Sequence, residues 1–199
     1  MSVASPNPDI TAAILAGGQG ARLGGRDKGL ELLAGKPLVA WVSQAIGPQA
    51  SKLLICASRN TQEYSAFGQV IADAADGYRG PLAGIAAALA ACTTQWLLTV
   101  PVDAPQPPSD LAGCLHAAVQ KSGNDCAVAY DGQRTQPLFA IYRRTLVDAA
   151  AAALENDLAV WRWQQECNAI RVDFSNHSAN FINLNTEADF RLWEQRENG

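Results

Sequence analysis

Apolar runs of strand length alternate with helix-like segments through the first half of the chain, and this alternation is the strongest constraint on its fold. The expected strands are residues 11–15, 53–57, 69–72 and 96–100, and the expected helices are residues 36–46, 63–67 and 82–92. Strands and helices in this order form right-handed βαβ units, which build a largely parallel sheet with helices on its faces. The pattern therefore predicts an α/β fold, a three-layer sandwich around a mainly parallel sheet.

The second half of the chain has a mixed pattern. We expect helices at residues 109–120, 145–155, 157–167 and 187–196, strands at 126–130, 137–142 and 170–174, and an extended piece at 181–184. The chain has 199 residues, of which 48% are hydrophobic. This length suits one α/β domain and falls short of two ordinary ones. We therefore expect a single domain over residues 1–199, in which the polar, proline-containing residues 1–9 are flexible.

Charge and cysteine content exclude several classes of protein. Lys and Arg number 15 against 19 Asp and Glu, so the net charge is −4. A protein that grips a nucleic-acid backbone needs a broad basic face, which this composition does not provide. The five cysteines are widely spaced without a C-x-x-C pair, and only two histidines are present. We therefore expect neither a disulfide framework nor a zinc site, and a reducing cytoplasm is the predicted location.

One uncharged segment, residues 80–102, is long enough on paper to cross a membrane. Pro81, Pro101 and the polar residues 93–95 divide it into an alanine-rich half and a short bulky half. A helix followed by a buried strand explains these two halves better than a membrane span. The apolar run after the N-terminus has no basic stretch before it, so no signal peptide is expected either.

A glycine-rich loop follows the first expected strand directly. The sequence from Leu15 to Lys28 is LAGGQGARLGGRDK. Its glycines allow the backbone to approach a ligand closely and to turn N–H groups towards an anion, and Arg22, Arg26 and Lys28 add positive charge. The loop matches neither the G-x-G-x-x-G dinucleotide fingerprint nor the Gly-Lys-Ser/Thr of a P-loop. Phosphate is nevertheless the ligand that such a loop suits best.

Two aspartates come at or just after the ends of expected strands. Asp73 follows residues 69–72, and Asp103 lies shortly after residues 96–100. Ligands of open parallel sheets bind beyond the carboxyl ends of the strands, where the strand order reverses, so the loop and both aspartates are expected to share one cleft. A hard carboxylate oxygen suits Mg²⁺, which makes Asp103 the candidate metal ligand. Turn formation remains the alternative role for both aspartates.

The loop resembles the L-A-G-G-x-G-x-R-x-G-x-x-K signature of nucleotidyltransferases with a Rossmann-like fold. Further stretches extend the resemblance to the MobA family of molybdenum cofactor guanylyltransferases: GPLAG at 80–84, PVDAP at 101–105, DGQR at 131–134 and FINLNT at 181–186. The resemblance implies a Rossmann-like, mainly parallel sheet of the nucleotidyltransferase type. It also implies transfer of GMP from GTP to the terminal phosphate of molybdopterin, with Mg²⁺ as cofactor and pyrophosphate as the second product.

The same resemblance implies roles for particular residues. Arg22, Lys28 and Asp103 would be catalytic, because the two cations would neutralise the triphosphate while Asp103 holds the metal. Cys56 stands where the family has an asparagine, so that contact is expected to be lost or taken by Ser58. The residues expected to bind the nucleotide are Leu15, Ala16, Gly17, Gly18, Lys28, Cys56, Asp73 and Asp103.

The acceptor side is expected near the C-terminal end of the chain. Asn183 and Asn185 alternate in the extended piece, and the resemblance places this piece beside the pterin. Arg134 is a further candidate for the acceptor phosphate. Turn geometry for the asparagines and a solvated surface position for Arg134 remain alternatives. Trp161 and Trp163 are interpreted as buried helix residues rather than as a stacking platform.

The expected small-molecule partners are GTP and molybdopterin, and molybdoenzyme apoproteins or their chaperones are expected as transient protein partners. Two other functions stay open. One is cytidylyl or other nucleotidyl transfer to molybdopterin or to a sugar or polyol phosphate, because Cys56 leaves the base preference undecided. The other is a non-catalytic module that binds a nucleotide or cofactor and delivers it. The combination of Arg22, Lys28 and Asp103 favours an enzyme, since simple binding does not need a metal carboxylate.

Overall fold

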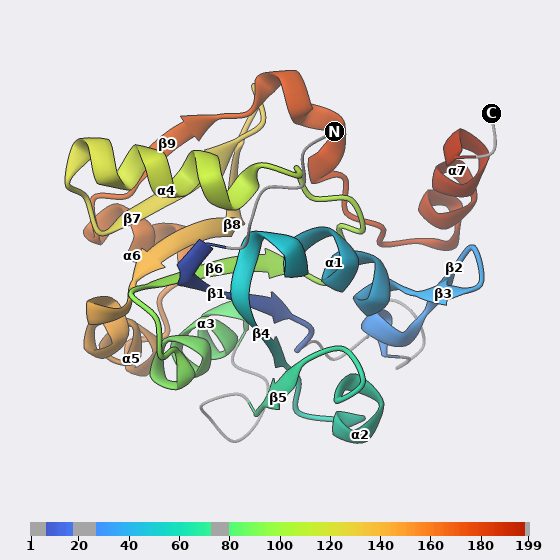
Figure 1. Ribbon diagram of the computed structural model, residues 1–199, viewed down its shortest axis with the longest axis horizontal. Coiled ribbons are helices and arrows are strands. Elements are labelled where there is room, and N and C mark those ends of the chain that lie inside the picture. Colours follow the sequence, from blue (N-terminus) through green and yellow to red (C-terminus); the bar gives the residue numbers. More distant parts are fainter. Residues whose placement is uncertain (1–6, 18–26, 73–79, 198–199) are drawn as a thin grey trace.

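The computed structural model describes residues 7–17, 27–72 and 80–197. At its centre lies a seven-stranded sheet in the order β5-β4-β1-β6-β8-β7-β9 (Figure 1). The strands are β1 (Asn7–Leu15), β4 (Ala50–Cys56), β5 (Gln69–Ile71), β6 (Trp96–Pro101), β7 (Cys126–Tyr130), β8 (Thr135–Arg143) and β9 (Ile170–Asp173). Neighbouring strands are parallel except at β8, which runs antiparallel to β6 and β7. The predicted α/β class with a mainly parallel sheet is confirmed.

Helices cover both faces of this sheet. The α-helices of the described residues are α1 (Leu38–Ile46), α2 (Thr61–Tyr64), α3 (Pro81–Ala91), α4 (Leu111–Ser122), α5 (Val147–Glu155), α6 (Val160–Glu166) and α7 (Glu187–Glu197). Helices α1 and α4 pack on one face, and α3, α5 and α6 pack on the other (Figure 1). Because both faces are covered, the central strands are continuous apolar runs. The result is the expected three-layer sandwich.

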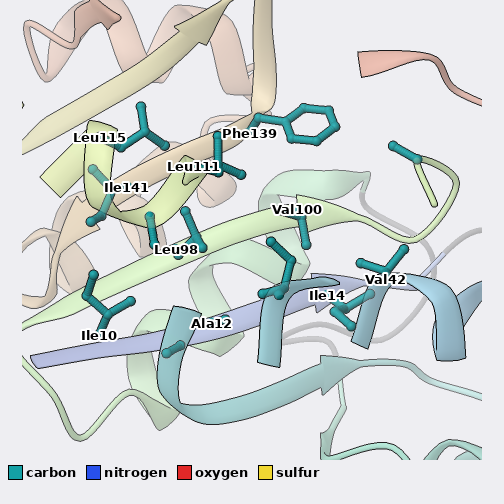
Figure 2. Packing of buried hydrophobic residues seen from close by; sticks show 14 of the residues in the cluster. Ile10, Ala12, Ile14, Val42, Leu98, Val100, Leu111, Leu115, Phe139 and Ile141 are labelled. Carbon is teal, nitrogen blue, oxygen red and sulfur yellow. The ribbon is translucent and has the colours of Figure 1, made fainter. Parts of the chain in front are cut away.

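Strand β1 shows how one strand serves both layers. Ala12 and Ile14 belong to the cluster beneath α1 and α4, in which Ile14 lies near Val42 of α1 (Figure 2). Ala13 and Leu15 belong to the cluster beneath α3 and α5. Successive side chains of a strand point to opposite faces, so a strand buried on both sides is mostly apolar. The end of β1 is therefore rigidly held on both faces.

A small hairpin and the last helix form a third cluster beside the main sheet. Strands β2 (Leu32–Leu33) and β3 (Lys36–Pro37) pair antiparallel. Trp193 of α7 packs with Leu33, Leu38 and Leu184, and its ring centroid lies 5.0 Å from that of Trp41. The helix expected over residues 36–46 starts only at Leu38, because Pro37 is extended and caps it. Helix α7 thus covers the hairpin that follows the glycine-rich loop (Figure 1).

Several expected boundaries are wrong near the termini. Strand β1 begins at Asn7, so residues 7–9 extend the strand rather than a flexible segment, and residues 1–6 lie outside the described part. Residues Ser175–Phe181 form a 3₁₀ helix, so only the later part of the extended piece at 181–184 remains extended. The burial of Phe181, whose ring packs edge-on against Phe139 at 4.9 Å, explains this turn.

The uncharged segment at residues 80–102 forms helix α3 and strand β6, as predicted. Among the described residues, no helix combines the length and the apolar character that a membrane span requires.

The carboxyl edge of the sheet contains the expected switch in strand order. The chain leaves β1 for β4 and β5 on one side and returns to β6 on the other. Leu15 and Pro101 lie opposite each other at the ends of β1 and β6, and the N–H of Val102 donates to the Leu15 carbonyl at 3.2 Å. Segments that leave these two strands therefore start side by side, at the position where such sheets bind ligands.

Candidate active site

Lys28 and Asp103 meet at this edge. Lys28 starts the short 3₁₀ helix η2 (Lys28–Leu30), and Asp103 lies two residues after β6. The ammonium Nζ of Lys28 lies 2.6 Å from Oδ2 of Asp103. Their side chains are 21% and 19% exposed, so the pair is partly shielded from water. Two of the expected site residues are thus brought together, whereas Gly18, Arg22, Arg26 and Asp73 lie outside the described residues.

The same ammonium also contacts the expected acceptor side. Nζ of Lys28 donates to Oδ1 of Asn185 at 2.7 Å. Asn185 lies in the irregular segment between the 3₁₀ helix η5 (Ser175–Phe181) and α7. One cation therefore links a carboxylate predicted for the nucleotide side with an amide predicted for the acceptor side.

Asp189 holds this irregular segment in place. Its Oδ2 accepts hydrogen bonds from the backbone N–H groups of Asn185 and Thr186, both at 2.8 Å. In return, the backbone N–H of Asp189 donates to the Thr186 hydroxyl at 3.2 Å. The two backbone hydrogen bonds are the main cause that lowers the pKa of Asp189; the Thr186 hydroxyl and the charge of Lys28 act in the same direction, and burial opposes them. Asp189 was not among the predicted site residues, although Thr-x-x-Asp at a helix start signals a capping box.

One of the two carboxylate oxygens of Asp103 makes no hydrogen bond to the described residues. This oxygen, Oδ1, is buried. An unpaired buried carboxylate oxygen is costly, and a hard cation is a natural partner for it. No cluster of three or more metal-ligating side chains occurs in the described part of the chain. Mg²⁺ commonly binds through one or two carboxylates together with water and substrate phosphates, so the residues present fit this ion.

The end of β1 forms the floor of the expected nucleotide side. Leu15 is 8% exposed, and the N–H of Ala16 donates to the carbonyl of Cys56 at 3.0 Å. The Cys56 side chain is fully buried, and its thiol donates to the carbonyl of Gly84 in α3 at 3.4 Å. Gly17 is the last described residue before the loop. The structure thus places the Cys56 thiol beneath α3 rather than on an exposed surface of the cleft.

A pocket of about 250 Å³ opens beside the end of β6. It brings together two of the residues expected on the acceptor side, Arg134 and Asn183. Oδ1 of Asn183 is buried without a hydrogen-bond partner among the described residues, whereas the Arg134 side chain is 72% exposed. The lining residues are Pro101, Arg134, Thr135, Gln136, Pro137, Leu138, Phe139 and Asn183.

The turn at Asp131 positions one wall of this pocket. Oδ1 of Asp131 accepts from the N–H groups of Gln133 and Arg134 at 2.8 and 2.7 Å, and Oδ2 accepts from Nε2 of Gln136 at 2.6 Å. Although burial opposes them, these hydrogen bonds lower the pKa of Asp131. A carboxylate that stays ionised at neutral pH keeps this turn in one conformation. The backbone of Arg134, whose side chain lines the pocket, is thereby fixed.

The tryptophan pair lies away from these residues, on α6. Trp163 is buried and stacks on Tyr142 with 5.0 Å between ring centroids, as expected for a core residue. Trp161 is 50% exposed, so the prediction that both rings are buried is wrong for this one. On a helix, positions two apart face different directions, which explains the difference.

Lys28, Asp103 and an adjoining pocket lie at the carboxyl edge of a doubly wound sheet, as expected for a nucleotidyltransferase. A family model described as the MobA-like NTP transferase domain matches residues 12–170. The chain belongs to this family.

Individual relatives agree with this membership. The chain is 41% identical over 185 residues to the molybdenum cofactor guanylyltransferase of Vibrio parahaemolyticus, covering 92% of this chain and 94% of that protein. It is 42% identical over 194 residues to the protein of the same name from Yersinia pseudotuberculosis, covering 96% and 98%. Two solved structures share the fold. Molybdopterin-guanine dinucleotide biosynthesis protein A from Archaeoglobus fulgidus has a TM-score of 0.79 at 23% identity, covering 94% of this chain and 98% of that one. The 2-C-methyl-D-erythritol 4-phosphate cytidylyltransferase from Thermus thermophilus has a TM-score of 0.70 at 16% identity, with the same coverage.

Proposed function

We propose that this chain is a molybdenum cofactor guanylyltransferase, which transfers GMP from GTP to the terminal phosphate of molybdopterin. Its relatives at 41% and 42% identity bear this name and match along more than nine-tenths of the chain. The observation that supports the proposal most directly is the bridging ammonium of Lys28, which contacts both Asp103 and Asn185. A cation in this position would lie where the two substrates meet.

Charge repulsion is the main physical obstacle to this reaction. An anionic phosphate must approach the α-phosphorus of a triphosphate, and two like charges at about 4 Å repel by about 4 kcal/mol at an effective dielectric constant of 20. Lys28, together with Arg22, would offset this repulsion and stabilise the charge that develops on the leaving group. Mg²⁺ bound at Asp103 would supply further neutralisation of the phosphate oxygens.

The bond changes need no protein base. An oxygen of the molybdopterin phosphate forms a new bond to the α-phosphorus, the bond between the α-phosphorus and the bridging oxygen breaks, and pyrophosphate leaves with the electron pair. A phosphate monoester is already ionised at neutral pH, so no proton has to be removed first. The role of the chain is therefore to position the two substrates and to balance their charge.

The remaining site residues divide between the two substrates in this proposal. The backbone from Leu15 to residue 18, together with Asp73, would hold the nucleotide, while Cys56 would contribute packing beneath α3. Arg134 and Asn183 would hold the acceptor in the pocket beside β6. Molybdoenzyme apoproteins or their chaperones would receive the product in the cytoplasm, the location predicted from the cysteine content.

The test compares nucleotide selectivity with product formation. Calorimetry with GTP, CTP, ATP and UTP in the presence of Mg²⁺ should show selective binding of GTP. Pyrophosphate release should then require both GTP and molybdopterin. Selective binding and turnover of CTP would replace guanylyl with cytidylyl transfer, and tight binding without any turnover would favour a carrier of nucleotide or cofactor.

A further inference from the structure

Four donors converge on the carboxylate of Asp27, the residue that precedes the active-site lysine. Its Oδ1 accepts from the N–H of Gly29 at 3.2 Å and from the Tyr64 hydroxyl at 2.6 Å. Its Oδ2 accepts from Nδ2 of Asn60 at 2.9 Å and lies 3.4 Å from Nε of Arg59. The Asp27 side chain is only 7% exposed. Both oxygens therefore have partners inside the protein.

These contacts exceed what a helix cap requires. The 3₁₀ helix η2 has three residues, and its cap consists of the single hydrogen bond from Gly29. The other three donors come from residues 59–60, which follow β4, and from Tyr64 on α2. Asp27 thus connects the end of the glycine-rich loop to a different segment at the same edge of the sheet. A residue that served only to start η2 would not need this connection.

Close packing restricts Gly29, the residue that follows Lys28. A Cβ at Gly29 would lie 2.2 Å from the Tyr64 hydroxyl oxygen and 3.0 Å from Cγ2 of Val102. The Gly29 backbone therefore packs directly between α2 and the residue that precedes Asp103. Because Asp27 and Gly29 are both held, the backbone of Lys28 has little freedom. The direction of its side chain towards Asp103 follows from this placement.

The surroundings of Asp27 also keep its negative charge from opposing an anionic substrate. Arg59 forms an ion pair with it, which offsets the charge close to the expected triphosphate site. Burial, followed by the hydrogen bond and the charge of Asp27, raises the pKa of Tyr64 far above its usual value of 10.0. Tyr64 therefore remains a neutral donor at every working pH. Because the oxygens of Asp27 have other partners, they do not compete with Asp103 and Asn185 for the ammonium of Lys28.

We propose that Asp27, held by Tyr64 and Asn60, is a positioning residue that orients Lys28 towards the nucleoside triphosphate. Preorganised charge is more effective than mobile charge, because no free energy is lost in ordering it when the substrate binds. The inference rests on the proposed function only in that Lys28 binds a triphosphate. It adds to that function three residues, none of which touches substrate, that act through Lys28.

A double-mutant cycle separates this role from a general effect on stability. The Kd of Mg²⁺-GTP is measured by calorimetry for the wild type, Tyr64→Phe, Lys28→Met and the double variant. Tyr64→Phe removes one hydrogen bond to a charged group, and we expect it to weaken binding about tenfold in the wild-type background. In the Lys28→Met background the same change should have less than about a twofold effect, because the group that it orients is absent. Equal factors in both backgrounds, or no effect in the wild type, would overturn the inference.

Two further variants keep the test decisive. Asn60 has a positive φ of 51°, so Asn60→Gly removes the amide without backbone strain and replaces Tyr64→Phe in the cycle if that variant fails to fold. Tyr142→Phe is the matched control, because Tyr142 is a buried tyrosine whose hydroxyl accepts from Gln164 at 2.7 Å, away from Asp27. It should lower Tm without changing the Kd of GTP.

The outcomes also separate this inference from the proposed function. A wild-type chain that binds GTP but transfers no GMP to molybdopterin contradicts the proposed function, and the binding cycle still decides the role of Asp27. If CTP is the nucleotide that binds, the cycle is run with CTP. A chain that binds no nucleoside triphosphate overturns both.

Discussion

The side-chain amide of Asn185 accepts a hydrogen bond from the ammonium of Lys28 at 2.7 Å, although 157 positions separate these residues in the chain. This hydrogen bond thus joins Asn185, expected on the acceptor side, to Lys28, expected on the nucleotide side. Binding of either substrate would change the surroundings of the other, and such coupling is reciprocal in free energy.

Asn185→Ala removes this bond without touching the Asp103 carboxylate. We expect the KM for molybdopterin to rise about tenfold, because one hydrogen bond on the acceptor side is lost, and the Kd of GTP to change by less than about threefold. Steady-state kinetics and calorimetry measure the two quantities. Asn156→Ala, at the exposed end of α5, should alter neither. A larger effect on GTP binding than on the KM for molybdopterin would contradict the assignment of Asn185 to the acceptor side.

Asp103→Ala removes the proposed ligand of Mg²⁺. Turnover should fall at least about a hundredfold, because several kcal/mol of charge stabilisation depend on the metal. GTP binding in the presence of EDTA should be unchanged or tighter, since Lys28 loses its carboxylate partner. Pyrophosphate release and a Mg²⁺ titration provide the readouts, with Asp148→Ala on the exposed side of α5 as control. Turnover that persists with an unaltered Mg²⁺ dependence would rule out Asp103 as the metal ligand.

Cys56→Ala tests whether the side chain that replaces the family asparagine contacts the nucleotide. The thiol is fully buried against the Gly84 carbonyl, so we expect the Kd of GTP to stay within about twofold. The free energy of unfolding should fall by about 1 kcal/mol, because a small buried group and a weak hydrogen bond are lost. Urea unfolding and calorimetry measure the two effects. A tenfold loss of GTP affinity would show that the thiol faces the ligand.

Gly29→Ala tests the close packing beside Lys28. The new Cβ would collide with the Tyr64 hydroxyl, and overpacking of this kind costs about 1–3 kcal/mol of stability. Tyr64→Phe in the same chain removes the shortest contact and should restore part of this loss. Gly47→Ala is the control, because a Cβ added there would meet no atom within 4 Å beyond its own chain neighbours. If Gly29→Ala is as stable as the control, the contact is not a constraint.

Asp189→Asn tests the acid dependence of stability. Backbone hydrogen bonds lower the pKa of Asp189 in the folded chain below its usual value of 3.8. A group with a lower pKa in the folded state contributes stability that is fully present above its unfolded pKa and is lost as the pH falls through the folded one. The free energy of unfolding of the wild type should therefore fall more steeply below about pH 4 than that of Asp189→Asn. Parallel pH profiles for the two proteins would show that Asp189 does not stabilise this segment.

Most of the sheet, and the edge at which a ligand is expected, could be predicted from the sequence. The runs around β1 and β6 are apolar except for the buried Thr11 and Thr99, because both faces of these strands are buried, and that pattern is visible without coordinates. The strands expected at residues 126–130 and 137–142 likewise correspond to β7 and β8, which pair with each other. From the strand ends, Asp103 and the loop with Lys28 followed as partners in one cleft.

The residues that sequence reasoning missed are those whose contacts come from distant segments. Asp27 and Tyr64 are separated by 37 positions, and nothing in either local pattern indicates that they touch. Cys56 was assigned by its alignment to a position that contacts the nucleotide. Because side chains alternate between the two faces of β4, Cys56 points with Leu54 towards α3. The position of that helix places the Gly84 carbonyl against the thiol.

By itself the sequence determined the class of fold, and it predicted an anion-binding loop with a carboxylate beside it. These features depend on local hydrophobic periodicity, on glycine content and on the general rule for the edges of parallel sheets. The tertiary structure alone decided that one ammonium contacts both Asp103 and Asn185, and that Asp27 and Asp189 hold the two segments that carry Lys28 and Asn185. The physical reason is that such contacts require side chains from separate elements to meet within hydrogen-bond distance, which packing determines and local sequence does not.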